Sequence, residues 1–324
     1  MKRRDALWAI LGIGALAHTA RAQPAKTWVI GLLDAGEREE WWTAFRQQLR
    51  TLGYVEGRNV TFEARYAGAK QDLLPSMADE LIRRKVDIIV TSGNVATIAA
   101  KHATDTIPIV MATGADQVSL GLAKSLSRPG ENVTGLTSLQ SDLTAKRFAL
   151  VREMFPGISR MAVLWHRDNV SSALSIRDLL SVAESAKVAV QNFPAKDADG
   201  VAEALRIAAR ERAQAVVVVH SPLIYRERRK IAELALKYKL PTMNGPSEYV
   251  DAGGLVSYAP SYSDLFRRAA IYVDRILKGA NPGDLPIEQP TKFELVLNQK
   301  TAKAIGAAIP ASVLLRADRV ISAL

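Results

Sequence analysis

The sequence predicts an α/β protein of two doubly wound lobes, each with a parallel β-sheet covered by helices on both faces, joined by a hinge. Short runs rich in β-branched residues alternate with helical patterns along the chain, and the second half repeats the order of the first. Near-continuous apolar strands separated by helices are typical of parallel sheets buried on both faces. The length of 324 residues is too great for one compact core and suits two domains.

The strand-like runs fall into two similar sets. Those of the first lobe cover residues 28–34, 60–66, 87–93, 108–114 and 133–138. Those of the second lobe cover residues 161–166, 188–193, 215–221, 241–245 and 254–258. Ser92, at the end of one run, is matched by Ser221 at the end of another, and Ile107-Pro108 is matched in the same way by Leu240-Pro241. The nearly constant spacing predicts two lobes of like topology.

The C-terminal part predicts how the lobes are connected. Ser261 and Asp264 resemble a capping box, and Tyr262 and Phe266 begin an apolar helical face that ends before Gly279. Residues 293–298 read as one more strand. We therefore predict that the first lobe comprises residues 23–139 and 261–283, and the second lobe residues 140–260 and 284–324.

The N-terminus has the pattern of a cleaved export signal. Lys2, Arg3 and Arg4 precede an apolar run at 6–17, and Ala20-Arg21-Ala22 forms a small-x-small cleavage site. About twelve apolar residues are too few for a membrane-spanning helix, which needs roughly twenty. The sequence therefore predicts a signal peptide over residues 1–22, with the export route left open.

The composition excludes several kinds of site. The chain has no cysteine, so a lipid-anchored mature N-terminus, a thiol nucleophile and a thiolate metal site are all excluded. The net charge of +10 falls to about +7 without the signal, and the basic clusters lie in helical patterns that also carry acids. We expect a periplasmic protein that does not bind nucleic acid.

Candidate ligand-binding residues follow from the predicted topology. In open parallel sheets, ligands bind beyond the carboxyl ends of the strands, where helix N-termini present free N–H groups. The first lobe supplies Asp34, Ser92, Gly93, Asn94, Asp116 and Ser138. The second lobe supplies Trp165, His220, Ser221, Asn244 and Tyr258. Each has a structural alternative, such as a helix cap for Ser92 or packing at a strand end for Trp165.

Motifs for catalysis and cofactor binding are absent from the mature sequence. It contains no Gly-x-Ser-x-Gly elbow, no His-Glu-x-x-His, no phosphate-binding loop and no dinucleotide fingerprint. His102, His166 and His220 do not have metal-ligand spacing. We therefore predict no catalytic residues, no cofactor and no metal site.

Four segments carry a resemblance to a known family. They are LGYVEGRNV at 52–60, SRPGENVTG at 127–135, AGGLVSY at 252–258 and LPIEQPTKFEL at 285–295. On these segments the chain resembles the extracytoplasmic substrate-binding proteins of ABC transporters, in the ABC-type family related to tryptophan-binding receptors. The resemblance implies a type I periplasmic-binding fold, two lobes closing on a small ligand, and delivery to a membrane permease.

Two departures from the family bear on the ligand. Asp116-Gln117-Val118 stands where the family often has Asp-Pro-Val, and Ser221-Pro222 stands where the aromatic amino acid branch has Asp-Asn. That Asp-Asn pair is suited to a ligand ammonium, so tryptophan is not the expected ligand. Asp34 or Asp116 could take its place, which leaves amino acids open.

The sequence is consistent with three functions. The first is a monomeric periplasmic receptor that binds a small organic ligand and delivers it to an ABC transporter permease. The second is an exported α/β enzyme that uses the same cleft, with His166 or His220 as the base. The third is a sensory binding protein that presents its closed form to a membrane receptor.

Overall fold

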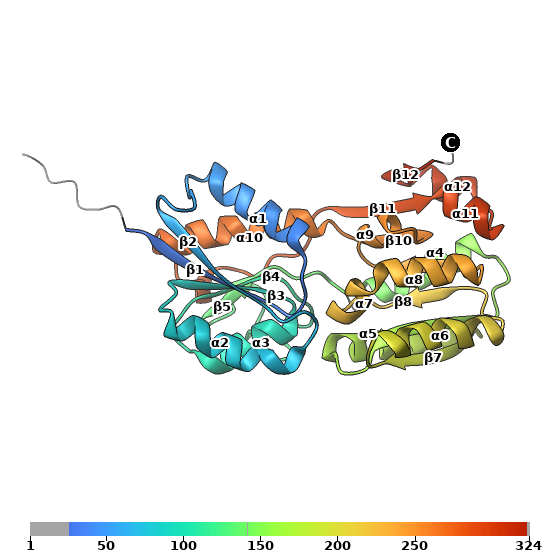
Figure 1. Cartoon of the computed structure of the whole chain (residues 1–324), viewed down its shortest axis with the longest axis horizontal. Helices are drawn as coiled ribbons and strands as arrows, with labels where there is room; N and C mark the ends of the chain where they lie inside the picture. Colours follow the sequence, from blue (N-terminus) through green and yellow to red (C-terminus); the bar gives the residue numbers. More distant parts are fainter. Residues whose placement is uncertain (1–25, 141, 323–324) are drawn as a thin grey trace, which may run out of the picture.

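The structure is a computed structural model that describes residues 26–140 and 142–322. Two α/β lobes lie side by side along the long axis of the molecule (Figure 1). The predicted signal peptide, residues 1–22, lies outside the described residues. Within the described residues, no helix is long and apolar enough to cross a membrane.

The first lobe has a five-stranded parallel sheet with the order β2-β1-β3-β4-β5. Its strands are β1 (Trp28–Asp34), β2 (Val60–Tyr66), β3 (Ile88–Ser92), β4 (Ile109–Thr113) and β5 (Val133–Gly135). Successive side chains of β1 enter different cores, with Ile30 and Leu32 in one cluster and Leu33 in the other. This is the burial on both faces that near-continuous apolar strands predict.

Helices cover both faces of the first sheet (Figure 1). One face is covered by α1 (Glu39–Thr51) and α10 (Tyr262–Leu277), and the other by α2 (Leu74–Arg83) and α3 (Asn94–Ala103). The short 3-10 helices are η1 (Gln71–Leu73) and η2 (Pro282–Asp284).

The second lobe has a seven-stranded sheet with the order β12-β11-β10-β9-β8-β6-β7, parallel except where β11 pairs with β10. Its strands are β6 (Arg160–His166), β7 (Ala189–Ala195), β8 (Val216–Val218), β9 (Thr242–Asn244), β10 (Val256–Pro260), β11 (Phe293–Asn298) and β12 (Arg319–Ile321). Its helices are α4 (Leu143–Met154), α5 (Val170–Ser185), α6 (Ala198–Arg210), α7 (Pro222–Arg226), α8 (Arg228–Lys237), α9 (Glu248–Asp251), α11 (Gln299–Ile305) and α12 (Ala311–Leu314). The predicted pair of doubly wound lobes is confirmed.

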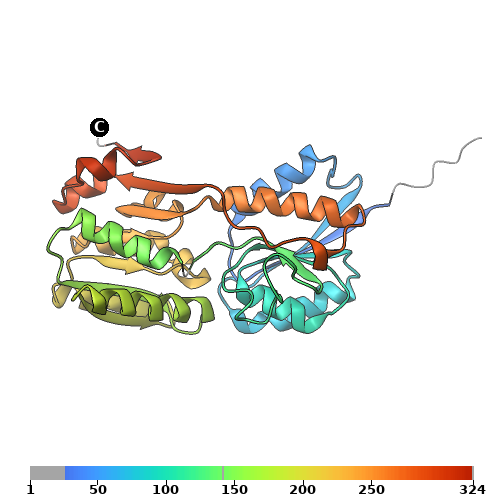
Figure 2. The same ribbon diagram turned by 180° about the vertical axis from the view of Figure 1, so that it is seen from behind.

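The chain passes between the lobes three times: after β5, after β10 and before β11. The last crossing is visible from behind, where β11 enters the second lobe (Figure 2). The predicted division at 283/284 lies too early, because residues 285–288 remain with the first lobe. The Thr134 hydroxyl donates to the Leu285 carbonyl at 2.6 Å, and Glu288 forms a bridge with Leu136.

The ends of α10 agree only partly with the sequence prediction. Ser261 is the N-cap residue, but its side chain accepts no capping hydrogen bond, so the predicted capping box is wrong. At the other end, Gly279 has a φ of +102° and follows the last turn, as the glycine stop predicts.

Gly135 allows a test of the close packing between β4 and β5 in the first sheet. Its φ is +128°, and an ideal Cβ would lie 2.1 Å from the Met111 carbonyl oxygen of β4. Because the obstacle is backbone, we expect Gly135→Ala to lower the free energy of unfolding by roughly 3 kcal/mol or more. Gly279→Ala is the matched control: it also has positive φ but open space around it, so we expect a loss of about 1–2 kcal/mol. Equal losses in urea unfolding would contradict the clash.

Candidate functional site

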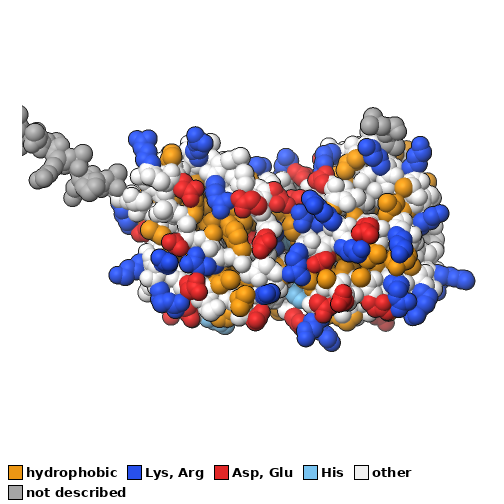
Figure 3. Space-filling view, in the orientation of Figure 1, with side chains coloured by type: hydrophobic (Ala, Val, Ile, Leu, Met, Phe, Trp, Pro, Cys, Tyr) orange, Lys and Arg blue, Asp and Glu red, His pale blue; other side chains and the backbone are white. Residues whose placement is uncertain are grey.

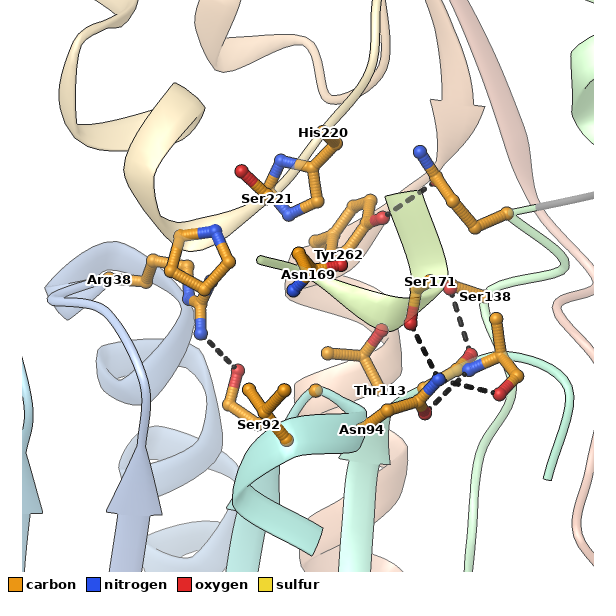
Figure 4. Close-up of a pocket in the computed structure, with 16 residues that line it drawn as sticks. Arg38, Ser92, Asn94, Thr113, Ser138, Asn169, Ser171, His220, Ser221 and Tyr262 are labelled. Atoms are coloured by element: carbon orange, nitrogen blue, oxygen red, sulfur yellow. Dashed lines mark hydrogen bonds between the residues drawn. The ribbon is translucent and has the colours of Figure 1, made fainter. Parts of the chain in front are cut away.

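A cavity of about 60 Å³ lies between the lobes at the carboxyl ends of their strands (Figure 4). The first lobe contributes the loops that follow β1, β3, β4 and β5 and the start of α10. The second lobe contributes the starts of α5 and α7. The lining residues are Arg38, Ser92, Gly93, Asn94, Val95, Thr113, Gly114, Ala115, Ser138, Gln140, Asn169, Ser171, His220, Ser221, Pro222 and Tyr262.

The β3–α3 turn supplies one wall of the cavity. Ser92 ends β3, Gly93 has a φ of +86°, and Asn94 begins α3. Glycine suits this conformation because it has no Cβ. The first-turn N–H groups of a helix have no acceptor within the helix, so the turn brings backbone donors to the cavity.

The N-termini of two helices supply the opposite wall. Asn169 caps α5, since its side chain accepts from Ser172 N at 3.0 Å, and Ser221 caps α7 by accepting from Ile224 N at 3.2 Å. The helix cap named as the alternative for Ser92 is wrong, because Gly93 is the N-cap residue of α3 and no side chain caps that helix. For Ser221, capping and lining the cavity occur together, because both depend on its position at the end of a strand.

Arg38 lines the cavity and forms a buried ion pair with Asp34. Its guanidinium donates to both carboxylate oxygens of Asp34 and, at 3.0 Å, to the Ser92 hydroxyl. Asp34 also accepts from Gly36 N at 2.8 Å and from Trp42 Nε1 at 2.9 Å. Asp34 is completely buried, so it orients Arg38 from behind the wall.

Asn94 connects the two lobes. Its Oδ1 accepts from Ala115 N at 3.0 Å, and its Nδ2 donates to the Ala115 carbonyl at 2.7 Å. The same Nδ2 donates at 2.7 Å to the Ser171 hydroxyl of the other lobe (Figure 4). This bond exists only while the lobes are together.

More contacts between the lobes lie around the cavity. The Tyr225 hydroxyl donates to Glu40, and Trp41 Nε1 donates to Glu248 at 2.5 Å. Arg226 donates to the Gly68 carbonyl at 2.7 Å. Side chains of both lobes thus meet on several sides, and the structure is a closed arrangement.

His220 lies in an aromatic enclosure on the cavity wall. Its ring centroid is 5.5 Å from that of Tyr262 and 5.9 Å from that of Trp41, and its Nδ1 is 3.3 Å from the Tyr249 hydroxyl. Burial lowers the pKa of His220 well below its usual value, and the nearby Arg38 and Arg147 lower it further. The imidazole is therefore neutral at pH 7.

Six of the residues predicted from the sequence lie in the cavity wall: Ser92, Gly93, Asn94, Ser138, His220 and Ser221. All six lie at or just after the carboxyl end of a strand. The topological rule located them without any catalytic or ligand motif.

The other five predicted residues are not in this wall. Asp34 lies behind Arg38, as described. Asn244 is turned into the sheet, where it donates to the Val256 carbonyl at 2.9 Å. The Tyr258 ring stacks on Phe293 with centroids 6.1 Å apart. In each of these three cases, the side chain contacts another part of the fold and does not line the cavity.

Trp165 and Asp116 do not line the cavity either. Trp165 Nε1 donates to Asn192 of β7 at 2.6 Å, so the ring lies along the second sheet. Asp116 has a φ of +55° and lines a neighbouring cavity of about 410 Å³, together with Gln117 and Asp142. The two cavities share Ala115 and Gln140.

Several polar residues of the wall are not among those predicted from the sequence: Arg38, Thr113, Gln140, Asn169, Ser171 and Tyr262. Arg38 stands four positions after Asp34, but the two residues lie on either side of a strand–helix turn and not on one helix, so the helical i,i+4 rule does not signal their ion pair. Tyr262 was assigned to the apolar face of a helix, and it does pack there, with its ring stacked on Trp41 at 4.5 Å. The described residues contain no group of three or more His, Asp or Glu side chains placed to hold a metal ion.

Comparison with known proteins connects this geometry to a family. The family described as ABC transporter substrate binding protein matches residues 28–321. A tyrosine-binding protein of Clostridioides difficile (strain R20291) is 26% identical over 261 residues, which cover 81% of this chain and 75% of that protein.

Solved structures show the same fold. The ABC domain from Streptococcus pneumonia in complex with L-Trp superimposes with a TM-score of 0.84 at 23% identity, covering 91% of this chain and 100% of that one. The ligand-free, open structure of a substrate-binding protein with adhesive properties from Clostridium difficile gives a TM-score of 0.67 at 22% identity, covering 92% and 100%.

The lowered pKa of His220 gives a testable pH dependence. In the unfolded chain histidine titrates near 6.5, whereas in the closed structure it titrates well below that. The unfolded state therefore binds more protons as the pH falls below about 6.5, and the closed structure loses stability there. We expect the free energy of unfolding to fall between pH 7 and pH 5 more steeply in the wild type than in His220→Asn. Parallel curves from urea unfolding would show that His220 is not held neutral.

Proposed function

Because the chain belongs to the ABC transporter substrate-binding protein family, we propose that it captures a small organic ligand in the cavity between its lobes and delivers it to a membrane permease. The observation that supports this is the construction of one cavity from both lobes. Ser92 and Asn94 stand on one side, and Ser171 and His220 on the other. A ligand that touches both sides stabilises the closed form over the open one.

We further propose that the six predicted wall residues, Ser92, Gly93, Asn94, Ser138, His220 and Ser221, contact the ligand. Arg38, Thr113 and Tyr262 join them. Polar groups converging on a small enclosed space, with aromatic rings beside them, are typical of a site that orients a small molecule.

The protein is proposed to act in the periplasm as a monomer after cleavage of residues 1–22, without a lipid anchor. The absence of cysteine supports the lack of a lipid anchor. On the face shown in Figure 3, acidic and basic side chains are interspersed over both lobes, which supports a solvated surface and not a nucleic-acid-binding one.

The proposed binding is not followed by chemistry. His166 Nδ1 is 3.4 Å from Gln71 Nε2, and His220 contacts the Tyr249 hydroxyl. The charge of Asp168 acts on His166, whereas the charged groups that act on His220 are two arginines, Arg38 and Arg147, and no acid. His220, the histidine in the cavity wall, therefore lacks the orienting acid that a general base commonly uses. Turnover of the bound compound would favour the enzyme interpretation instead.

The first test is the compound that the protein carries. We expect mass spectrometry of denatured, natively purified protein to release one small organic compound, and deletion of the gene to abolish uptake of that compound. Unchanged uptake after deletion would contradict the transport role and favour a sensory one. Absence of any released compound, together with unchanged uptake of all solutes tested, would remove the receptor proposal.

The second test blocks closure. Ser92, the last residue of β3, is completely buried and accepts from Arg38, so Ser92→Trp places an indole in the closed cavity. We expect the affinity for the released compound to fall roughly a hundredfold or more because the lobes cannot close. Ser76→Trp, at an exposed serine of α2 in the same lobe, is the control and should bind normally. Calorimetric titration measures both, and unchanged affinity in Ser92→Trp would remove this residue from the site.

A further inference from the structure

The wall of the cavity contains no acidic side chain. Asp34, behind the wall, has both oxygens occupied by Arg38, Gly36 N and Trp42 Nε1. Asp116 lines a neighbouring cavity and not this wall. Glu248 accepts from Trp41 Nε1 and is likewise outside the wall. The wall itself therefore offers no carboxylate to a ligand ammonium.

A buried cation without a counter-charge stands next to the cavity. Arg147 of α4 is 4% exposed, and it donates to the Tyr258 carbonyl at 2.8 Å and to Gln140 Oε1 at 3.4 Å. Among the described residues it forms no ion pair, in contrast to Arg38, whose charge Asp34 balances. Burial lowers the pKa of Arg147 to about 10, which still leaves it charged at neutral pH.

Arg147 acts on the cavity at close range. Gln140, which accepts its hydrogen bond, lines the cavity, and its own amide nitrogen is buried without a partner. His220, also in the wall, has its pKa lowered partly by the charge of Arg147. A buried charge is costly unless it is paired, and attraction is strong where water is excluded.

Hydrogen-bond donors at the cavity reinforce this positive potential. The N-termini of α3 and α5, helices of 10 and 16 residues from opposite lobes, both lie at the wall. Each places the positive end of a helix dipole there. The hydroxyl groups of Ser92 and Thr113 add neutral groups that can donate.

We propose that the ligand is a small organic carboxylate that carries no ammonium group. This inference deepens the proposed function and rests on it. The carboxylate balances the charge of Arg147 on closure, whereas an α-amino acid would bury an additional cation beside Arg147 with no acid to receive it. The cavity volume of about 60 Å³ favours a small molecule, since one water needs roughly 10–15 Å³ by the same measure.

Matched ligands test the proposal. Protein that has been unfolded, freed of bound compound and refolded is titrated calorimetrically with propionate, lactate and alanine, and with 3-phenylpropionate, phenyllactate and phenylalanine. Propionamide controls for the carboxylate. We expect at least one acid without an ammonium group to bind, and to bind at least tenfold more tightly than the amino acid of the same skeleton and than the neutral amide.

Two outcomes overturn the proposal. Binding of an amino acid as tight as that of its des-amino partner would do so, and so would failure of every acid to bind. Neither outcome touches the receptor function, which is tested separately by the released compound and by uptake.

The role of Arg147 is tested by Arg147→Met, with Arg152→Met as the control. Both substitutions remove one positive charge from α4, but Arg152 is exposed. We expect the affinity of the bound acid to fall at least tenfold only in Arg147→Met. Equal affinities in the two variants would overturn the assignment to Arg147. If Arg147→Met does not fold, the ligand series on the wild-type protein still decides the charge of the ligand.

Discussion

The arrangement of the cavity depends on the buried ion pair between Asp34 and Arg38. Asp34 lies fully buried at the carboxyl end of β1. Its two carboxylate oxygens accept hydrogen bonds from Gly36 N, the Arg38 guanidinium and Trp42 Nε1. Helix α1 begins without a side-chain cap, so these bonds are what hold the β1–α1 turn. Loss of one partner of a buried pair costs about 3–5 kcal/mol, because the other charge is left unpaired.

The same turn determines how the lobes meet. By fixing the start of α1, it places Trp41 against Tyr262, and these two rings form the surface on which His220 of the second lobe packs. Closure therefore joins an aromatic surface of one lobe to a histidine of the other. Polar contacts such as the bond from Asn94 to Ser171 then limit the closed arrangement to one geometry. Contacts with a ligand therefore add to the stability of an interface at which the two lobes are already complementary.

The sequence was sufficient for the fold and for six of the residues that line the cavity. Buried parallel strands have a strong periodic signal, and the rule that ligands bind beyond their carboxyl ends located residues such as Ser92 and His220. The same rule does not say which way a side chain turns at the end of a strand. Asn244 and Tyr258 turn toward neighbouring strands, and this depends on partners far away in the sequence. Arg38 and Arg147 were missed because arginine is usually solvated, and only tertiary contacts show that these two are buried.

The three crossings between the lobes have a consequence for how the chain folds. The first lobe needs α10 to cover the face beside α1, and the second lobe needs β11 and β12 to complete its sheet. Neither lobe is a continuous piece of chain, so an N-terminal fragment exposes the apolar surface that α10 would cover. The first lobe can complete its folding only when nearly the whole polypeptide is available, because α1 and α10 are far apart in the sequence. We therefore expect both lobes to complete folding in one late, shared step.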